Sequence, residues 1–485
     1  MRWTAMDRQT RLFWSFTTLS LIISITFVQP IGAEYADSRH LSSIHQHVLT
    51  RPGDFTRNPI PAEGKVRTYG IMDNTMASQC LNAGWHDWFV ERYDAMQVYS
   101  PWFDTDTAWY ANGFEYKDLY AIYDCTQATT PSSSPVSPTS PNSICASANT
   151  EHLALYNAAM DAEEDTSEPD WLLKDDEGNR LYIPTTDAFG RHTQFAADVR
   201  TPAFRGFWIE QMHSALTRGS YEGLFVDDVN MDMNRALSNG ECRPADFPYE
   251  PDCVWETDIE PSAWSGHVVT FVQEIRDAFP NHTIIHNSVW FQAPIGHKHT
   301  DAQIQAADII TFERGLNDRG IIGGNGPTSV SAFFNYNDDV HNAGRDVLHY
   351  LHVFGFETLG VLAELKQMEY GLAGWLLISE GGDYIGSSRY DDPMNWWEGF
   401  EVNLGPASSD RHQLTPGVFR RTFEHGVVLL NEPASSASEA PAHIDLLGLY
   451  KTLNNECIEH VVLPPRTGKI LFAVDACTQA AGFTH

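Results

Sequence analysis

From Lys65 to about Ser379 the chain alternates short apolar or β-branched runs with helical patterns. This alternation predicts a parallel sheet with crossover helices. Apolar positions recur at helical spacing in Arg205–Leu216, Trp264–Phe279 and Glu357–Tyr370. The expected strands are Arg67–Met72, Met96–Ser100, Leu119–Tyr123, Gly223–Val226, Thr283–His286, Ile309–Phe312, Val347–Val353 and Trp375–Ile378. Eight strands in this order predict an α/β fold, a closed (β/α)8 TIM barrel over residues 65–400.

The pattern changes after Ser379, where shorter apolar runs are separated by Pro, Gly and Ser. The strands expected there are Val418–Thr422, Gly426–Leu430, Ile444–Tyr450, His460–Leu463 and Lys469–Val474. They predict a small antiparallel β domain over residues 401–485. Between the third and fourth barrel strands, the acidic insertion at residues 162–180 is expected to form a hairpin within Trp171–Tyr182.

Residues 1–33 have the parts of a secretory signal peptide. Basic residues precede an apolar run from Leu12 to about Val28, and Ala33 supplies a small residue for cleavage. A membrane anchor is the alternative, because the basic segment is long. We expect an N-terminal extension over residues 34–64 and a secreted protein, extracellular or periplasmic, with no membrane contact after cleavage.

The seven cysteines fit an oxidising compartment. The simplest connectivity joins neighbours in the sequence and leaves Cys80 unpaired. The expected pairs are Cys125–Cys145, Cys242–Cys253 and Cys457–Cys477. The first pair would bracket a Ser- and Pro-rich loop, residues 126–144, to which the sequence assigns no role.

The charge of the chain bears on its partners. There are 64 acidic and 31 basic residues, a net charge of -33. Such a surface repels nucleic acid, anionic membranes and polyanionic glycans, and it favours a neutral or cationic substrate. Acid excess is also typical of a salty habitat, in which case it says nothing about the substrate. The oligomeric state stays open.

The segment Tyr221–Asn230 is the most informative for chemistry, because an apolar strand there runs directly into two carboxylates and an amide. Functional groups of such barrels lie where strands end, at the carboxyl-terminal face. A carboxylate at a strand end is costly to bury unless it is paired, hydrogen-bonded or used. Asp227 is therefore the first catalytic candidate, with a structural loop cap as the alternative. Asp228 points the other way on an extended chain and is expected to be structural or to bind substrate.

Cleavage of a glycosidic bond needs a second acid. The best candidate is Glu313, because it follows the apolar strand that begins after Ala307. The neighbouring Arg314 offers an alternative, in which Glu313 is half of an ordinary ion pair. With Asp227 as its partner, Glu313 would complete a two-carboxylate site for hydrolysis of an oligo- or polysaccharide.

Other strand-end groups and aromatic residues are candidates for binding sugar hydroxyls and the flat apolar faces of sugar rings. The expected substrate contacts are Asp73, Asp198, Asp228, Asn287, Trp102, Trp109 and Glu380. Asp124 and Asp383 are further strand-end acids. For each of these residues a role in capping, ion pairing or core packing is the alternative.

Competing chemistries have little support in the sequence. It contains no HExxH motif, no GxSxG elbow and no P-loop. The alternating oxygen ligands that begin at Asp228 lack the glycine and the final glutamate of an EF-hand. We therefore expect no metal ligands and no cofactor.

The stretch DVRTPAFR (residues 198–205), followed by a helix and then by GLFVDDVN (residues 223–230), resembles the putative glycoside hydrolase family fifteen of the glycoside-hydrolase-like barrels. It is more distantly similar to α-galactosidase and polygalactosaminidase barrels. FRRTFEHGVVLLN (residues 419–431) and LPPRTGKIL (residues 463–471) resemble the β domain that follows such barrels. The resemblance implies that Asp227 is the nucleophile or base and that Glu313 is the proton donor.

Three alternatives to a hydrolase remain at this point. The same site could serve a transglycosylase, or the barrel could be catalytically silent and bind glycans. A metal-dependent deacetylase would need a His/Asp cluster that the sequence does not show. Within the hydrolase hypothesis, a carboxyl separation of about 5 Å would imply retention and roughly 6.5–9.5 Å inversion.

Overall fold

The computed structural model describes residues 65–71, 83–100, 103–104, 109–131, 134–145, 150–167, 169–183, 187, 189–233, 259, 261–290, 297–351, 361–387, 396–434 and 441–476. Several expectations lie outside these residues. They concern the segments 1–33 and 34–64, the candidates Asp73 and Trp102, and the cysteines Cys80, Cys242, Cys253 and Cys477.

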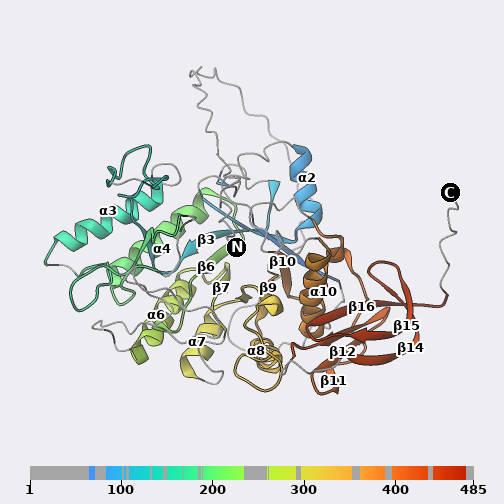
Figure 1. The fold of residues 1–485 in the computed structure, drawn as a ribbon. Coiled ribbons are helices and arrows are strands. Elements are labelled where there is room, and N and C mark those ends of the chain that lie inside the picture. The colour runs from blue at the N-terminus through green and yellow to red at the C-terminus, as the bar shows by residue number, and fades with distance from the viewer. Residues whose placement is uncertain are drawn as a thin grey trace, which may run out of the picture. The chain divides into compact units, whose positions relative to one another are not determined.

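Eight parallel strands close into a barrel, which confirms the predicted fold class (Figure 1). In chain order they are β1 (Thr68–Ile71), β2 (Ala95–Val98), β3 (Gly113–Asp118), β6 (Gly223–Asp227), β7 (Thr283–Asn287), β8 (Ile309–Phe312), β9 (Asp346–Leu351) and β10 (Tyr384–Ser387). Each strand pairs with its neighbours in chain order, and β1 pairs with β10 to close the barrel. All carboxyl ends therefore meet at one face.

Two of the expected strands are wrong. The third barrel strand is β3, whereas the expected segment Leu119–Tyr123 contributes β4 (Ala121–Tyr123), which pairs antiparallel with β5 (Gln194–Ala196). The eighth strand is β10, and the expected Trp375–Ile378 is the last turn of a helix. Both segments are apolar because they are buried, and a short apolar run does not distinguish a buried strand from a buried helix.

Helices follow most strands and cover the outside of the barrel (Figure 1). They are α2 (Ala83–Arg92), α3 (Thr150–Glu164), α4 (Pro202–Arg218), α6 (Pro261–Ala278), α7 (Lys298–Ala306), α8 (Val330–Asn342) and α10 (Val361–Ile378), with the short 3-10 helices η2 (Gly315–Asn317) and η3 (Glu398–Glu401). The three helices predicted from periodicity correspond to α4, α6 and α10, although residues 357–360 of the third prediction lie outside the described residues. Within the described part of the chain, none of the helices combines the length and apolarity needed to cross a membrane.

Aromatic side chains fill the barrel interior. Tyr69, Phe114, Phe225 and Tyr350 are buried in one cluster. The ring centroids of Tyr69 and Phe114 lie 6.0 Å apart, and those of Tyr69 and Tyr350 lie 5.7 Å apart. Because Phe225 precedes the end of β6 by two residues, these rings form a floor beneath the strand ends.

The predicted C-terminal β domain is confirmed as a six-stranded sheet. Its strands are β11 (His412–Thr415), β12 (Val418–Phe423), β13 (Gly426–Asn431), β14 (Ala442–Thr452), β15 (Cys457–Leu463) and β16 (Thr467–Val474). Alternate residues of β13 enter different cores: Val428 packs with α10 of the barrel, and Val427 packs under β14 and β15. A Cβ at Gly468 would come within 2.6 Å of the Cβ of Ala373 in α10, so this contact requires glycine.

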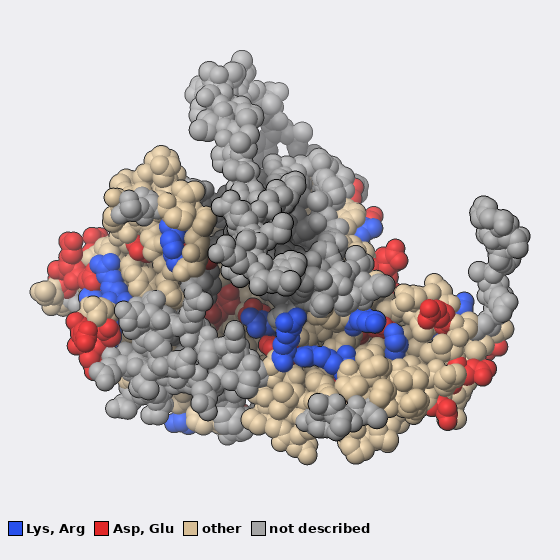
Figure 2. Space-filling model, in the orientation of Figure 1, with Lys and Arg blue, Asp and Glu red and all other residues tan. Residues whose placement is uncertain are grey.

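Charged residues are unevenly distributed. Figure 2 shows acidic side chains toward both ends of the visible face, and basic side chains gathered near the place where α10 meets the C-terminal sheet. The net charge of -33 is therefore not spread evenly over the surface. The charge that a substrate meets depends on the groups in the site itself.

A buried histidine–carboxylate pair ties α8 to the amino ends of the last strands. The Nε2 atom of His341 lies 3.1 Å from Oδ1 of Asp383, which also accepts a hydrogen bond from the backbone N–H of Val347 at 2.7 Å. Burial of the imidazole opposes its charge, but the carboxylates of Asp383 and Glu380 outweigh burial and raise the pKa of His341 to about 9. Protonated His341 thus stabilises this end of the barrel.

We expect the stability contributed by His341 to depend on pH. A histidine whose pKa is raised on folding contributes fully below the unfolded value of ~6.5, and its contribution is lost as the pH rises through about 9. The melting temperature of wild type should therefore exceed that of His341→Gln most at pH 6 and least at pH 10. Exposed His412 supplies the control variant His412→Gln. A difference that is the same at both pH values would contradict this role.

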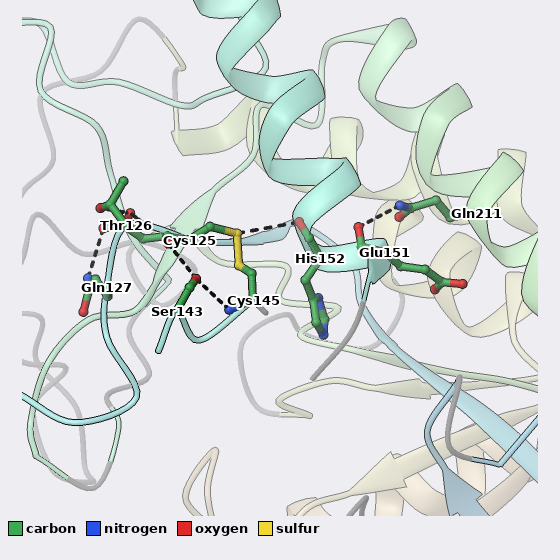
Figure 3. Close-up of a disulfide and its surroundings, with 9 residues drawn as sticks. Cys125, Thr126, Gln127, Ser143, Cys145, Glu151, His152 and Gln211 are labelled. Carbon is green, nitrogen blue, oxygen red and sulfur yellow. Dashed lines mark hydrogen bonds between the residues drawn. A yellow bond between two sulfur atoms is a disulfide. The ribbon is translucent and has the colours of Figure 1, made fainter. Parts of the chain in front are cut away.

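A disulfide joins Cys125 to Cys145, which confirms the first predicted pair (Figure 3). Inside the loop that it closes, the Ser143 hydroxyl donates to the carbonyl of Cys125 at 2.7 Å. Cys125 Sγ lies 3.9 Å from the carbonyl oxygen of His152 in α3. Cys457 is also disulfide-bonded. The predicted hairpin of the acidic insertion is present too, with Lys174 bridged to Arg180.

Removing this disulfide should destabilise the region around α3. The cysteines are 20 residues apart in sequence, and the entropy of closing a loop of that size corresponds to about 3 kcal/mol. We expect Cys125→Ala combined with Cys145→Ala to lower the melting temperature and to accelerate hydrogen exchange in α3 more than in α8, which serves as the internal control. Unchanged exchange in α3 would show that the loop adds no stability there.

Candidate active site

Alternation along the strands places the candidate groups at the carboxyl-terminal mouth of the barrel. Phe225 faces the interior, so Asp227, two residues further along β6, projects from the same face. Ile285 is interior in β7, and Asn287 follows it in the same way. Glu313 comes directly after β8. Three consecutive barrel strands thus each deliver a polar side chain to one mouth.

Asp227 is held by three hydrogen-bond donors. Its Oδ2 accepts from the hydroxyl of Tyr116 at 2.7 Å. Its Oδ1 accepts from Nδ2 of Asn287 at 2.7 Å and from the backbone N–H of Asp228 at 2.8 Å. Donors that converge on a carboxylate favour its ionised form and fix its orientation. The donors come from β3, from β7 and from the residue after Asp227 itself.

Glu313 is in a different environment. Its side chain is exposed to the cavity at the mouth, yet protein surrounds it closely on its other sides. Burial and the charge of Asp227 raise the pKa of Glu313, while Arg314 and the Asn287 side chain oppose the rise. The ion pair that the structure gives Arg314 is to Asp318, with 3.9 Å between Nη1 and Oδ2. These surroundings favour a protonated Glu313.

A cavity opens beside these groups. Its lining residues, drawn from the segments after β6, β7 and β8, are Asp228, Asn230, Asn287, Ser288, Val289, Trp290, Glu313, Arg314 and Asp318. The indole of Trp290 is held against Phe333 at a centroid distance of 5.3 Å. The cavity thus combines one aromatic wall with several carboxylates and amides, the lining that a sugar ring requires.

The residue after each candidate carboxylate has a left-handed backbone. Asp228 has a φ of 54° and Arg314 a φ of 69°. This conformation costs free energy for residues other than glycine and is concentrated at functional sites. At both strand ends it turns the chain sharply, directly after Asp227 and Glu313. Asp228 lines the cavity, and Nδ2 of Asn230 donates to its Oδ1 at 3.1 Å.

The model of hypothetical glycosyl hydrolase family 15 matches residues 142–427, more than half of the chain. The chain belongs to this family. The match contains Asp227, Asn287 and Glu313 and begins after β3. The barrel is thus that of a glycoside hydrolase, as the sequence resemblance predicts. No curated protein sequence matches the chain.

Several solved structures are similar to this family 15 chain. The glycoside hydrolase domain of PelA from Pseudomonas aeruginosa has 8% identity and a TM-score of 0.37, with 68% of this chain and 96% of that chain covered. The noncanonic maltogenic α-amylase AmyB from Thermotoga neapolitana has 9% identity and a TM-score of 0.43, with coverage of 85% and 99%. The GH36 α-galactosidase AgaA from Geobacillus stearothermophilus has 13% identity and a TM-score of 0.39, with coverage of 87% and 57%.

Three expected substrate contacts of this hydrolase lie elsewhere. The Oδ2 of Asp198 is 2.7 Å from Nη2 of Arg200, an ion pair in the turn before α4. The ring of Trp109 stacks on His86 at a centroid distance of 4.2 Å, within the packing around α2. Glu380 precedes β10 and so lies at the amino end of that strand. We therefore do not retain these residues as sugar contacts.

The two other strand-end acids also have structural surroundings. Asp124 Oδ1 accepts from the hydroxyl of Thr126 at 2.6 Å, and Oδ2 accepts from Gln127 at 3.1 Å, so Asp124 stabilises the turn after β4. Asp383 is the partner of His341 at the opposite face of the barrel. Among the described residues, no group of three or more His, Cys, Asp or Glu side chains could hold a metal ion.

Sequence reasoning missed two residues beside Asp227. Tyr116 and Asp118 both belong to β3, whereas the sequence pattern predicts the third barrel strand at Leu119–Tyr123. Asp118 is the direct neighbour of Asp227 in the register of β3 and β6. The available signal was the alternation of Phe114, Tyr116 and Asp118, an aromatic strand that ends in a carboxylate, as β6 does.

An additional carboxylate at position 287 should be costly at this site. Asn287→Asp conserves shape but places an acid between Asp227 and Glu313, where like charges repel. We expect the melting temperature of this variant to fall relative to wild type as the pH rises from 4 to 8. Exposed Asn403, whose Oδ1 accepts from the backbone of Gly405, supplies the control Asn403→Asp. Equal pH dependence of the two variants would rule out close contact of Asn287 with both carboxylates.

Proposed function

We propose that this glycoside hydrolase cleaves O-glycosidic bonds of a neutral or cationic glycan by a two-carboxylate mechanism. The observation that carries the proposal is the contrast between Asp227 and Glu313. Asp227 accepts three hydrogen bonds that favour its anion, whereas burial and the Asp227 charge raise the pKa of Glu313. A carboxylate fixed by donors beside a carboxyl group of raised pKa is the combination that supports a base or nucleophile and an acid.

In this proposal Glu313 donates a proton to the glycosidic oxygen as the bond breaks. Asp227, ionised and fixed by Tyr116 and Asn287, acts on the anomeric carbon as nucleophile or activates a water molecule as base. Asn287 donates to Oδ1 of Asp227 and orients it, and its side chain also opposes the rise in the pKa of Glu313. Each role needs only a proton transfer or a bond to carbon, which carboxyl groups supply.

The cavity supports a sugar without negative charge. Asp228, Glu313 and Asp318 line it, and Arg314 is paired with Asp318 rather than left for an anionic ligand. The indole of Trp290 offers an apolar surface, and Asn287 and Asp228 offer acceptors and a donor for hydroxyl groups. We also propose that the protein acts outside the cytoplasm, because the N-terminal segment reads as a signal peptide and a disulfide is present.

The test is a screen of the purified protein against glycans and aryl glycosides, followed by Asp227→Asn and Glu313→Gln on any substrate found. Each variant should lose activity by about a thousand-fold or more, with the melting temperature within a few degrees of wild type. Asp198→Asn and Glu380→Gln are matched controls, because these acids lie outside the site, and they should retain activity.

Full activity in Asp227→Asn or Glu313→Gln would overturn the assignment of the pair. NMR of the first product anomer gives the role of Asp227: retention indicates a nucleophile and inversion a base. Products longer than the substrate would indicate a transglycosylase. Glycan binding with no product in any assay would indicate a silent glycan-binding barrel.

A further inference from the structure

Asp118 and Asp227 occupy equivalent positions on neighbouring strands. They are direct partners in the parallel register of β3 and β6, so their side chains project from the same face of the barrel. Both strand ends are fixed: the indole Nε1 of Trp208 donates to the carbonyl of Asp118 at 2.8 Å, and the N–H of Leu119 donates to the carbonyl of Asp227 at 3.0 Å. Two carboxyl groups are therefore held side by side at the mouth.

The hydroxyl of Tyr116 lies between these carboxyl groups. It is 2.7 Å from Oδ2 of Asp227 and 3.2 Å from Oδ1 of Asp118. The ring is fixed by Tyr99, at a centroid distance of 4.8 Å, and by Phe225, at 6.0 Å. A tyrosine hydroxyl has one proton, and the shorter contact places it toward Asp227.

The Tyr116 hydroxyl is within donor range of both carboxyl groups, but its one proton cannot serve two ionised carboxylates equally. A proton on Asp118 would let that carboxyl group supply the hydrogen of the longer contact. The other oxygen of Asp118 accepts from Nε2 of Gln194 at 3.1 Å. With a proton on Asp118, the three groups would form a chain in which Asp118 donates to Tyr116 and Tyr116 donates to Asp227.

We propose that Asp118 holds a proton while Asp227 is ionised and that, acting through Tyr116, it is a positioning residue for the Asp227 carboxylate. The proton on Asp118 lets Tyr116 commit its own proton to Asp227, and it removes a second negative charge from the strand end. The protonation of Asp118 does not depend on the proposed function, whereas its effect on activity rests on it.

The charges around Asp118 agree with this role. Burial and the charge of Asp227 raise the pKa of Asp118 to about 7, while a hydrogen bond donated by Tyr116, the charge of Lys117 and a hydrogen bond from Gln194 oppose the rise. The first of these opposing effects is lost when the Tyr116 proton is turned toward Asp227. Lys117 lies on the other side of β3, where its Nζ is 3.1 Å from Oε1 of Gln211. Among the described residues, further titratable groups that interact with Asp118 are Asp228 after β6, Tyr99 after β2, Tyr120 after β3 and Tyr123 of β4.

The first test needs no substrate. An acid whose pKa is raised on folding contributes stability below its unfolded value of ~3.9 and loses that contribution as the pH rises through about 7. Asp118→Asn removes this loss, so its melting temperature relative to wild type should rise by several degrees from pH 4 to pH 8. The rise should be smaller in an Asp227→Asn background, where the neighbouring charge is absent. Asp445→Asn, at an exposed site in β14, is the control.

Infrared difference spectra provide a second measurement on the whole protein. At pH 6, the difference spectrum of wild type minus Asp118→Asn should contain a protonated-carboxyl band that the spectrum of wild type minus Asp445→Asn lacks. A pH-independent melting difference, or no such band in the first difference spectrum, would overturn the proposal. Neither result depends on turnover, so failure here is distinguishable from failure to find a substrate.

On any substrate found by the screen, the relay predicts a specific kinetic pattern. Tyr116→Phe removes a donor from Asp227, so kcat should fall more than KM changes, and the acidic limb of the kcat/KM profile should move to higher pH. Asp118→Asn, which can still donate to Tyr116, should lose less kcat than Asp118→Leu. Equal losses in these two variants, or an unmoved acidic limb in Tyr116→Phe, would contradict a positioning role.

Discussion

The site depends on how one carboxylate is held at the end of β6. Asp227 receives a hydrogen bond from Tyr116 of β3 on one side and from Asn287 of β7 on the other. These bonds run across three adjacent strands, so the orientation of the carboxylate is set by the barrel and not by a loop. A charge fixed in this way needs little reorganisation when a reaction begins.

The same carboxylate organises the ionisation of its neighbours. Burial raises the pKa of both Glu313 and Asp118, and the charge of Asp227, which lies between them, raises both further. A glycosidase needs one protonated and one ionised carboxyl group at the same pH, and a carboxylate held by protein donors beside a more buried carboxyl group is an arrangement that favours this asymmetry. The left-handed residues after Asp227 and Glu313, Asp228 and Arg314, turn the chain at the two strand ends and line the cavity.

The rest of the architecture keeps the strand ends in place. The aromatic floor formed by Tyr69, Phe114, Phe225 and Tyr350 supports the mouth from within the barrel. Helix α10 packs against β12, β13 and β16 of the C-terminal sheet, so the last part of the barrel and that sheet share a core. At the opposite face, His341 and Asp383 connect α8 to the start of the final strands. The proposed catalytic residues and this stabilising pair thus lie at opposite ends of the strands.

The sequence alone determined the fold class, most strands, the C-terminal sheet and the two strand ends at Asp227 and Glu313, because period-two patterns and abrupt changes from apolar to acidic residues are local. The local pattern gave the wrong element where a segment is apolar because it is buried outside the barrel strands. Leu119–Tyr123 is buried under α3 and α4, and Trp375–Ile378 is the buried last turn of α10. Because of these two errors, the sequence pattern places Glu380 at the carboxyl-terminal face of the barrel and assigns no role to Tyr116 and Asp118.

Only the tertiary structure decided which acids act together. Asp198 and Asp227 both follow short apolar segments, but one is neutralised by Arg200 and the other is presented to the mouth. Ionisation states depend on burial and on charges from other strands, such as that of Asp227 on Glu313 across β7. Such interactions join residues distant in sequence, so they arise only when the barrel closes. The sequence therefore located the carboxylates, and the fold determined the ionisation state that each of them favours.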